Sequence, residues 1–301
     1  MARTVVVTGA SSGIGYCTAL TLARSGFEVI GTVRDESKGR PLLDAAAAAR
    51  LPVRTELLDV TDPDSCRTAF ERIAARTGGG PWAVVNNAGT ALPGAVDDPG
   101  EEQIRVLLDT NLLGPARIAA HVLPVMRRRG EGRIVNVSSI AGRVGVPLLG
   151  WYSASKHALK ALTHALRMEN ARDGVRVILV EPGIIATPMW ETGTRLLDGL
   201  DGSHFAAGYR GIALAARLAA RFPGPETVAA AIERALRARR PRPRYLVGAD
   251  AYWSAAAELC VPLRWSDRVK EISVGLRPSP VARLLRQARD CGAGHVSRRG
   301  A

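Results

Sequence analysis

A tyrosine and a lysine four positions apart, Tyr152 and Lys156, are the residues whose types and spacing best suit chemistry in this sequence. On a helix, residues i and i+4 project from the same face, which would hold the phenol and the ammonium side by side. A nearby cation favours the phenolate and lowers the pKa of a tyrosine from its usual value of about 10. Such a tyrosine can act as a general acid or base. Because this spacing also occurs by chance on solvated helices, the surrounding sequence must show whether the pair is catalytic.

A glycine-rich turn follows the first apolar run of the chain. Residues 8–15 read Thr-Gly-Ala-Ser-Ser-Gly-Ile-Gly, between a predicted strand and a predicted helix. The spacing departs from the common Gly-x-Gly-x-x-Gly pattern, but the physical roles are the same. Glycines allow a tight turn and a close approach of backbone to phosphate, and a helix N-terminus offers N–H groups to an anion. The turn predicts a dinucleotide site that includes Gly9, Ser11, Ser12, Gly13, Ile14 and Gly15.

The end of the second predicted strand indicates which dinucleotide binds. An acidic residue at this place would accept the ribose hydroxyl of NAD, whereas an arginine accommodates the 2′-phosphate of NADP. The sequence has Val33 and then Arg34, whose guanidinium suits a phosphate. Ser11 could add a hydroxyl donor. These residues favour NADP(H), and the neighbouring Asp35 keeps NAD(H) open as the less favoured alternative.

Short β-branched runs alternate with amphipathic stretches along most of the chain. The runs are apolar at consecutive positions, as in strands covered on both faces. We therefore predict an α/β fold: a Rossmann-type, doubly wound parallel sheet of about seven strands with helices on both faces. The predicted strands are 4–8, 28–33, 53–58, 83–86, 133–138, 175–182 and 245–247. The predicted helices are 13–25, 62–76, 101–129, 152–173 and 226–239.

We expect one catalytic domain over residues 1–250, with a substrate-binding insertion at about 188–222. The insertion is helical in pattern but is interrupted by glycines. Residues 251–301 are expected to form a C-terminal helical extension packed on the domain, with a disordered end that begins near Cys291.

Composition restricts the class of protein. Of the 301 residues, 47% are hydrophobic, enough for a real core, and no apolar run approaches the length of a membrane span. The N-terminus shows no signal-peptide pattern, so we expect a cytoplasmic protein. The four cysteines have no metal-ligand spacing and suit free thiols, and no metal site is predicted. The net charge of +13 could serve nucleic acid or a membrane surface, but we favour a solvated basic surface with no nucleic-acid partner.

Taken together, these motifs resemble the short-chain dehydrogenases/reductases, in the single-domain branch that acts on steroid and retinoid alcohols and ketones. The resemblance covers residues 3–190 closely and 225–250 loosely. Its further motifs are Asn111, Ser139 thirteen positions before Tyr152, and Pro182-Gly183 with Ile185 and Thr187. The resemblance also implies cofactor contacts from Asp59, Val60, Asn87, Ala88 and Gly89.

The resemblance implies NADP(H)-dependent hydride transfer between a carbonyl and its alcohol. Tyr152 would exchange the proton with the substrate oxygen, and Lys156 would lower the pKa of the tyrosine and bind the nicotinamide ribose. Ser139 would orient the substrate, and Asn111 would hold a water that continues the proton relay. The family also implies a homodimer or homotetramer.

Substrate identity depends on the variable insertion. Apolar residues around it predict a hydrophobic ketone, aldehyde or alcohol, with contacts from Ser139, Val144, Leu149, Tyr152, Met189 and Trp190. The alternative function is a non-catalytic NADP(H)-binding regulator on the same fold. An extended-branch epimerase or dehydratase also uses Tyr-x-x-x-Lys, but its glycine spacing differs.

Overall fold

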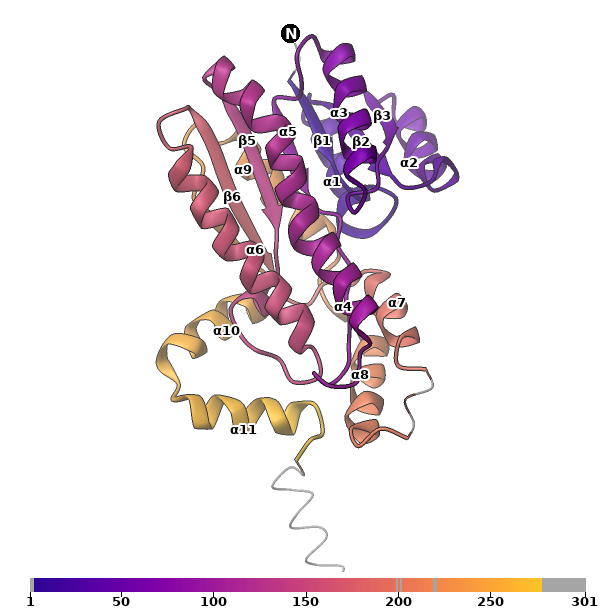
Figure 1. Ribbon diagram of the computed structural model, residues 1–301, viewed down its shortest axis with the longest axis vertical. Coiled ribbons are helices and arrows are strands. Elements are labelled where there is room, and N and C mark those ends of the chain that lie inside the picture. The colour runs from indigo at the N-terminus through magenta and orange to yellow at the C-terminus, as the bar shows by residue number, and fades with distance from the viewer. Residues whose placement is uncertain (1–2, 199, 201, 219–220, 278–301) are drawn as a thin grey trace, which may run out of the picture.

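A seven-stranded parallel sheet lies between two layers of helices (Figure 1). The computed structural model describes residues 3–198, 200, 202–218 and 221–277. The sheet order is β3-β2-β1-β4-β5-β6-β7, with every pairing parallel. All the predicted strands are confirmed, with ends shifted by at most one residue. Their bounds are β1 Thr4–Val7, β2 Glu28–Val33, β3 Val53–Leu57, β4 Ala83–Asn86, β5 Gly132–Val137, β6 Val175–Pro182 and β7 Arg244–Val247.

The sheet is apolar on both faces because helices cover both. Along β1, Val5 and Val7 pack into one hydrophobic cluster and Val6 into the other. This alternation follows from successive side chains pointing to opposite faces of a strand. It explains why the strands are apolar at consecutive positions in the sequence.

Helices α1 (Gly13–Arg24), α2 (Glu36–Ala48) and α9 (Glu226–Arg237) cover one face of the sheet. Helices α3 (Pro63–Thr77), α5 (Gly114–Arg129) and α6 (Gly150–Glu169) cover the other. The start of α3 agrees with the sequence pattern, because the Asp62 side chain caps the helix through the N–H of Asp64.

Two helices differ from the sequence-based expectation. Helix α2 was not predicted, since Gly39 and Pro41 lie inside it and both residues disfavour helix interiors. The expected continuous helix over 101–129 is wrong. It is divided into α4 (Glu101–Leu108), a π-helical turn η1 (Asp109–Leu113) and α5.

The insertion and the C-terminal extension form a separate group of helices. The insertion contains α7 (Met189–Arg195) and α8 (Ala206–Leu218), and the extension contains α10 (Ala249–Cys260) and α11 (Leu263–Ser273). Helix α10 buries Ala251 and Ala255, whereas α11 buries none of its residues. Beyond α11, Val274 and Leu276 pack against a small cluster that includes Tyr209 of α8. The extension therefore runs from β7 back to the insertion.

None of the helices in the described ranges is both long and apolar enough to cross a bilayer. The three cysteines in those ranges are free thiols, Cys17, Cys66 and Cys260. Cys291 and the predicted disordered end lie outside the described residues.

Candidate active site

The predicted site residues follow the carboxyl ends of adjacent strands. The chain leaves β1 towards β2 on one side and later returns to β4 on the other, so the sheet order reverses between β1 and β4. In open parallel sheets, ligands bind outside the carboxyl ends at this reversal. The glycine turn follows β1, and residues 87–89 follow β4. A short 3-10 turn, η2 (Ile140–Gly142), follows β5.

The glycine turn needs glycine at three places. Gly9 and Gly13 have φ of +66° and +54°, in the left-handed region that favours glycine. A side chain at Gly15 would place its Cβ 2.2 Å from the carbonyl oxygen of Gly9 and 2.5 Å from Nδ2 of Asn87. At Gly13, a Cβ would lie 3.5 Å from Thr187, which follows β6. The turn is thus enclosed by backbone on one side and by the segment after β6 on the other.

Arg34 lies at the edge of this turn. The N–H of Ala10 donates to the carbonyl of Thr32 at 2.9 Å, which ties the turn to the end of β2. Arg34 is exposed there, and it makes no ion pair with the described residues. Asp35, in contrast, caps α2 by accepting hydrogen bonds from N and Oγ of Ser37, both at 2.8 Å. These bonds also lower the pKa of Asp35. The Asp35 carboxylate, which the sequence left as a possible partner for the ribose of NAD(H), therefore caps α2 instead.

The segment after β4 is bonded to the glycine turn. Nδ2 of Asn87 donates to the carbonyls of Thr8 and Gly9 at 2.9 and 3.2 Å. The N–H groups of Asn87 and Ala88 both donate to Oγ1 of Thr8. A Cβ at Gly89 would lie 3.6 Å from Nζ of Lys156, so this segment reaches the proposed catalytic lysine.

Asp59 and Val60 follow β3, beside these segments. Oδ1 of Asp59 accepts hydrogen bonds from the N–H and hydroxyl of Thr61 at 2.9 and 2.7 Å. Val60 is buried and packs against Gly114, where an added Cβ would lie 3.0 Å from its side chain. The pair shapes this turn, and its predicted contact with the adenine stays a prediction.

The π-helical turn η1 positions Asn111. Pro115 has no N–H, so it cannot donate to the carbonyl of Asn111 four residues earlier, and its ring crowds that carbonyl. The buried Asn111 side chain is fully bonded. Its Oδ1 accepts from the N–H of Thr90 at 2.9 Å, and its Nδ2 donates to the carbonyl of Thr90 and to Oγ of Ser155. The backbone carbonyl of Asn111 therefore lacks the donor that an ordinary α-helix would supply four residues later.

Tyr152 and Lys156 lie in the first two turns of α6. Nζ of Lys156 is 5.8 Å from the centre of the Tyr152 ring and donates to the carbonyl of Val137 at 3.2 Å. Burial raises the pKa of Tyr152, and a hydrogen bond with Ser139 partly opposes this rise. Burial lowers the pKa of Lys156 to about 8. In this structure the tyrosine pKa is thus raised, unlike the lowering expected from the sequence, because desolvation dominates and Lys156 bonds to the backbone instead.

Ser139 lies two residues after the end of β5, where its hydroxyl accepts from the N–H of Ala141 at 3.1 Å and caps η2. The capping bond orients the Ser139 hydroxyl, which is close enough to Tyr152 to offset part of the rise that burial causes in the pKa of that tyrosine. The structure therefore brings together all four predicted catalytic residues around the start of α6: Asn111 bonds to Ser155, Lys156 faces the Tyr152 ring, and Ser139 adjoins Tyr152.

The segment after β6 is held by the C-terminal extension. The N–H of Gly183 donates to the carbonyl of Val247 at 2.8 Å, and Oδ2 of Asp250 accepts from the N–H of Ile184 at 2.6 Å. A Cβ at Gly183 would lie 2.1 Å from the same carboxylate. Asp250, at the start of α10, thus holds the backbone between Pro182 and the buried Ile185.

The predicted substrate residues lie on two segments. Val144 is buried and Leu149 partly buried in the loop after η2, whereas Met189 is 37% exposed at the start of α7. The indole of Trp190 donates to the carbonyl of Ile185 at 3.0 Å. Trp190 and Thr187 line a cavity of about 620 Å³ between α7 and α8.

Sequence reasoning missed the residues that hold the insertion in place. Oδ2 of Asp98, after β4, accepts from the hydroxyl of Ser203 at 2.7 Å and also from the hydroxyl of Tyr209. The N–H of Ala95 donates to the Tyr209 hydroxyl at 2.9 Å. These residues are more than 100 positions apart in the sequence, and no motif marks them. Asp250, Thr90 and Ser155 were also missed, because their partners lie 66, 21 and 44 positions away and no spacing rule links them.

Comparisons with known proteins identify the family of the chain. Residues 3–195 match the short chain dehydrogenase family. Human 17-beta-hydroxysteroid dehydrogenase type 1 is 38% identical over 81% of this chain and 77% of its own length. A short-chain dehydrogenase structure from Streptomyces avermitilis has a TM-score of 0.74 at 30% identity, covering 92% of this chain and 99% of that one. Actinorhodin polyketide ketoreductase with NADPH has a TM-score of 0.65 at 31% identity, over 77% and 88%.

Proposed function

Because the chain belongs to the short chain dehydrogenase family of oxidoreductases, we propose that it interconverts a hydrophobic ketone or aldehyde and its alcohol with NADP(H). The observation that carries the proposal is the convergence of Asn111, Ser139, Tyr152 and Lys156 beside a turn shaped for a dinucleotide. The expected resemblance to steroid and retinoid enzymes is supported by the similarity to human 17-beta-hydroxysteroid dehydrogenase type 1.

The residues around the glycine turn fit a phosphorylated dinucleotide. The Ser12 side chain makes no capping bond at the start of α1, and the first turn of α1 carries no acidic residue. The N–H groups and positive dipole end of α1 are thus left to an anion. Arg34 would bind the 2′-phosphate, as it does not pair with a carboxylate of the described residues and Asp35 is engaged in its cap. This arrangement supports NADP(H) over NAD(H), in line with the bound NADPH of the actinorhodin enzyme.

Tyr152 would transfer the proton at the substrate oxygen. When bound, the nicotinamide supplies or accepts the hydride. The phenol of Tyr152, whose pKa burial raises above its usual value of about 10, is protonated at neutral pH and can donate to a carbonyl oxygen during reduction. Ser139, whose hydroxyl is oriented by the N–H of Ala141, would orient the same oxygen.

Lys156 and Asn111 would restore the proton on Tyr152. With a pKa of about 8, Lys156 can give and regain a proton near neutral pH. The side chain of Asn111 is fully bonded, so its backbone carbonyl, which Pro115 cannot serve, is the group that would hold a relay water.

The substrate would be hydrophobic. Four apolar side chains of the loop after η2 and of the start of α7 support this expectation: Val144, Leu149, Met189 and Trp190. The indole N–H of Trp190 is already bonded to the carbonyl of Ile185. Steroids, polyketides and long-chain carbonyl compounds are hydrophobic substrates of this kind.

Absorbance of NADPH, followed with a panel of hydrophobic ketones, aldehydes and quinones, tests the proposal. We expect turnover of at least one ketone, and Tyr152→Phe should lower kcat about a thousandfold while NADPH affinity is retained. Tyr252→Phe, which changes an exposed phenol of α10, is the matched control. NADPH binding without any turnover would favour the regulator instead.

Arg34→Ala tests the choice of cofactor. It should lower kcat/KM for NADPH about tenfold and leave kcat/KM for NADH unchanged.

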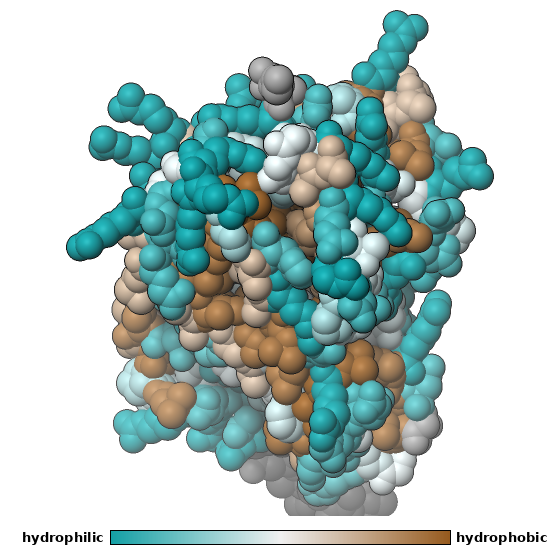
Figure 2. Space-filling model, turned by 45° about the horizontal axis from the view of Figure 1, so that its top comes forward, coloured by the Kyte–Doolittle hydropathy of each residue, from teal (hydrophilic) through white to brown (hydrophobic). Residues whose placement is uncertain are grey.

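We also propose that α4, α5 and α6 form the interface of a homodimer or homotetramer. Val106 of α4, Leu113 of the turn η1 between α4 and α5, and Met168 of α6 are 49%, 47% and 67% exposed. Figure 2 shows hydrophobic side chains across the middle of the molecule, below a hydrophilic rim. Measurement of the mass in solution by light scattering tests this assembly.

A further inference from the structure

The C-terminal extension exposes an unusual amount of apolar surface. Of the seventeen large hydrophobic side chains that are exposed in the described residues, seven lie between 252 and 269. We call these seven the apolar belt: Tyr252, Trp253, Leu259, Val261, Leu263, Trp265 and Val269. Trp253 and Leu259 are 77% and 84% exposed, and α11 buries no residue at all. The belt therefore contributes little to the core of the protein.

An arginine-lined groove adjoins the belt. A cavity of about 1030 Å³ lies between α9, β7 and α10. Tyr252 and Leu259 of the belt line it, so the groove and the belt share one wall. The opposite walls carry five arginines, which we call the arginine groove: Arg143, Arg234, Arg237, Arg242 and Arg244.

The groove has more positive charge than its carboxylates neutralise. The buried Glu181 pairs with Arg143 at 2.9 Å and with Arg244 at 3.4 Å, and Glu233 pairs with Arg237 at 3.1 Å. Arg234 and Arg242 form no ion pair with any described residue. Two arginines are thus left to an external anion beside the exposed Tyr252 and Leu259.

From this pairing of charge and apolar surface, we propose that the extension docks the protein on an anionic phospholipid membrane surface. The arginine groove would bind lipid phosphates, and the apolar belt would enter the boundary between headgroups and acyl chains. Tryptophan and tyrosine favour that boundary because one end of each ring is apolar and the other polar. The protein would lie on the membrane without crossing it. The preference for a merely solvated basic surface is thereby revised for this part of the molecule.

Charge and side-chain type favour a membrane over the other partners. A second copy docked through the same face would bring two arginine grooves of like charge together. Single-stranded nucleic acid is bound by stacking on aromatic rings, whereas Leu259, Leu263 and Val269 offer no such surface.

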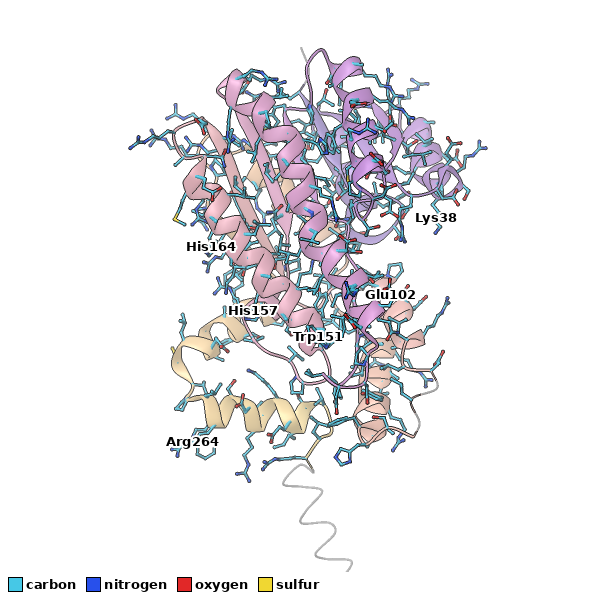
Figure 3. The ribbon with its side chains drawn as sticks, viewed as in Figure 1. Lys38, Glu102, Trp151, His157, His164 and Arg264 are labelled. Carbon is cyan, nitrogen blue, oxygen red and sulfur yellow. The ribbon has the colours of Figure 1, made fainter. Side chains whose placement is uncertain are left out.

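The docked orientation would place the catalytic end of the sheet near the lipid. Figure 1 shows α10 and α11 at the end of the molecule where α6 begins, the end at which Figure 3 labels Trp151. Val274 and Leu276, after α11, reach the cluster that contains Tyr209 of the insertion. The inference is independent of the proposed turnover, which is measured on dissolved substrates.

Sedimentation of the full chain with phospholipid vesicles tests the proposal. We expect binding to vesicles of equal parts phosphatidylcholine and phosphatidylglycerol, weak binding to phosphatidylcholine alone, and loss of binding at high salt. Arg234→Glu with Arg242→Glu should weaken binding about tenfold or more. Trp253→Ser should weaken it about tenfold.

Matched variants control for general charge and hydrophobicity. Arg128→Glu with Arg172→Glu makes the same charge change at exposed positions that belong to neither the groove nor the belt, and Leu57→Ser removes an exposed apolar side chain from β3. Both should bind as the original chain does, and all variants should retain turnover.

Three results would overturn the proposal. One is equal binding to both kinds of vesicle, or to neither. Another is self-association without vesicles that Trp253→Ser abolishes, which would make the belt an interface between copies. The third is saturable binding of monomeric dodecyl phosphate with no vesicle binding, which would make the groove a site for a soluble amphiphile.

Discussion

The cofactor side and the substrate side of this molecule are held together by different kinds of contact. On the cofactor side, backbone lies against backbone: Gly15 lies against the carbonyl of Gly9, and the N–H of Ala10 bonds to the carbonyl of Thr32. On the substrate side, α8 is held through a few side chains, chiefly Asp98 with Tyr209. Backbone contacts tolerate almost no change of residue, whereas side-chain contacts can be replaced. The difference explains how one fold can keep its cofactor while its substrate changes.

The largest expected effect comes from Gly15→Ala, on the cofactor side. The new Cβ would overlap the carbonyl of Gly9 and the amide of Asn87, neither of which can move freely. We expect a loss of about 3 kcal/mol in the free energy of unfolding and a loss of NADPH binding. Denaturant unfolding and fluorescence titration measure these. Gly202→Ala, which meets no atom within 4 Å, is the control and should change stability by less than about 0.5 kcal/mol.

The next effect concerns Lys156, whose buried ammonium is expected to reduce the stability of the folded protein at neutral pH. Its pKa falls from 10.5 to about 8 on folding, so between these values the unfolded chain binds more protons. The free energy of unfolding should therefore rise with pH across this window, by about 3 kcal/mol in total.

Lys156→Met tests this expectation, since it removes the buried ammonium. The variant should be inactive but more stable than the original chain at pH 7, and the advantage should disappear as the pH passes from about 8 to 10.5. Lys38→Met, at an exposed position, should show no such trend. An advantage that does not change with pH would mean that Lys156 is not destabilised by burial.

The smallest effect is expected from Tyr209→Phe, on the substrate side. The variant removes one donor to Asp98 and the acceptor for the N–H of Ala95. A net hydrogen bond contributes about 1 kcal/mol, so we expect a rise of about fivefold in the KM of the carbonyl substrate. The KM of NADPH should not change. An equal rise in the KM of the carbonyl substrate and the KM of NADPH would contradict the distinction between a substrate side and a cofactor side.

The same difference decides what the sequence could predict. The strands were predictable because helices cover both faces of the sheet, which makes the strands apolar at consecutive positions. The glycine turn and Tyr152 were predictable because their chemistry depends on spacing within one segment. The π-helical turn was not, since Asp109–Leu113 reads as helix whether or not its register shifts by one residue. The contacts of Asp98 and Asp250 were not predictable either, because each joins segments far apart in the chain.

The position of Asp250 has a consequence for how the gene can be altered. Its carboxylate holds the N–H of Ile184 while Val247, three residues earlier, accepts from Gly183. The spacing between β7 and α10 is therefore fixed from both ends, and an insertion or deletion there would displace the segment that closes the glycine turn. The extension cannot be exchanged between relatives as an independent cassette at residue 250. A chimera or truncation that respects the architecture must keep the chain intact through the first turn of α10.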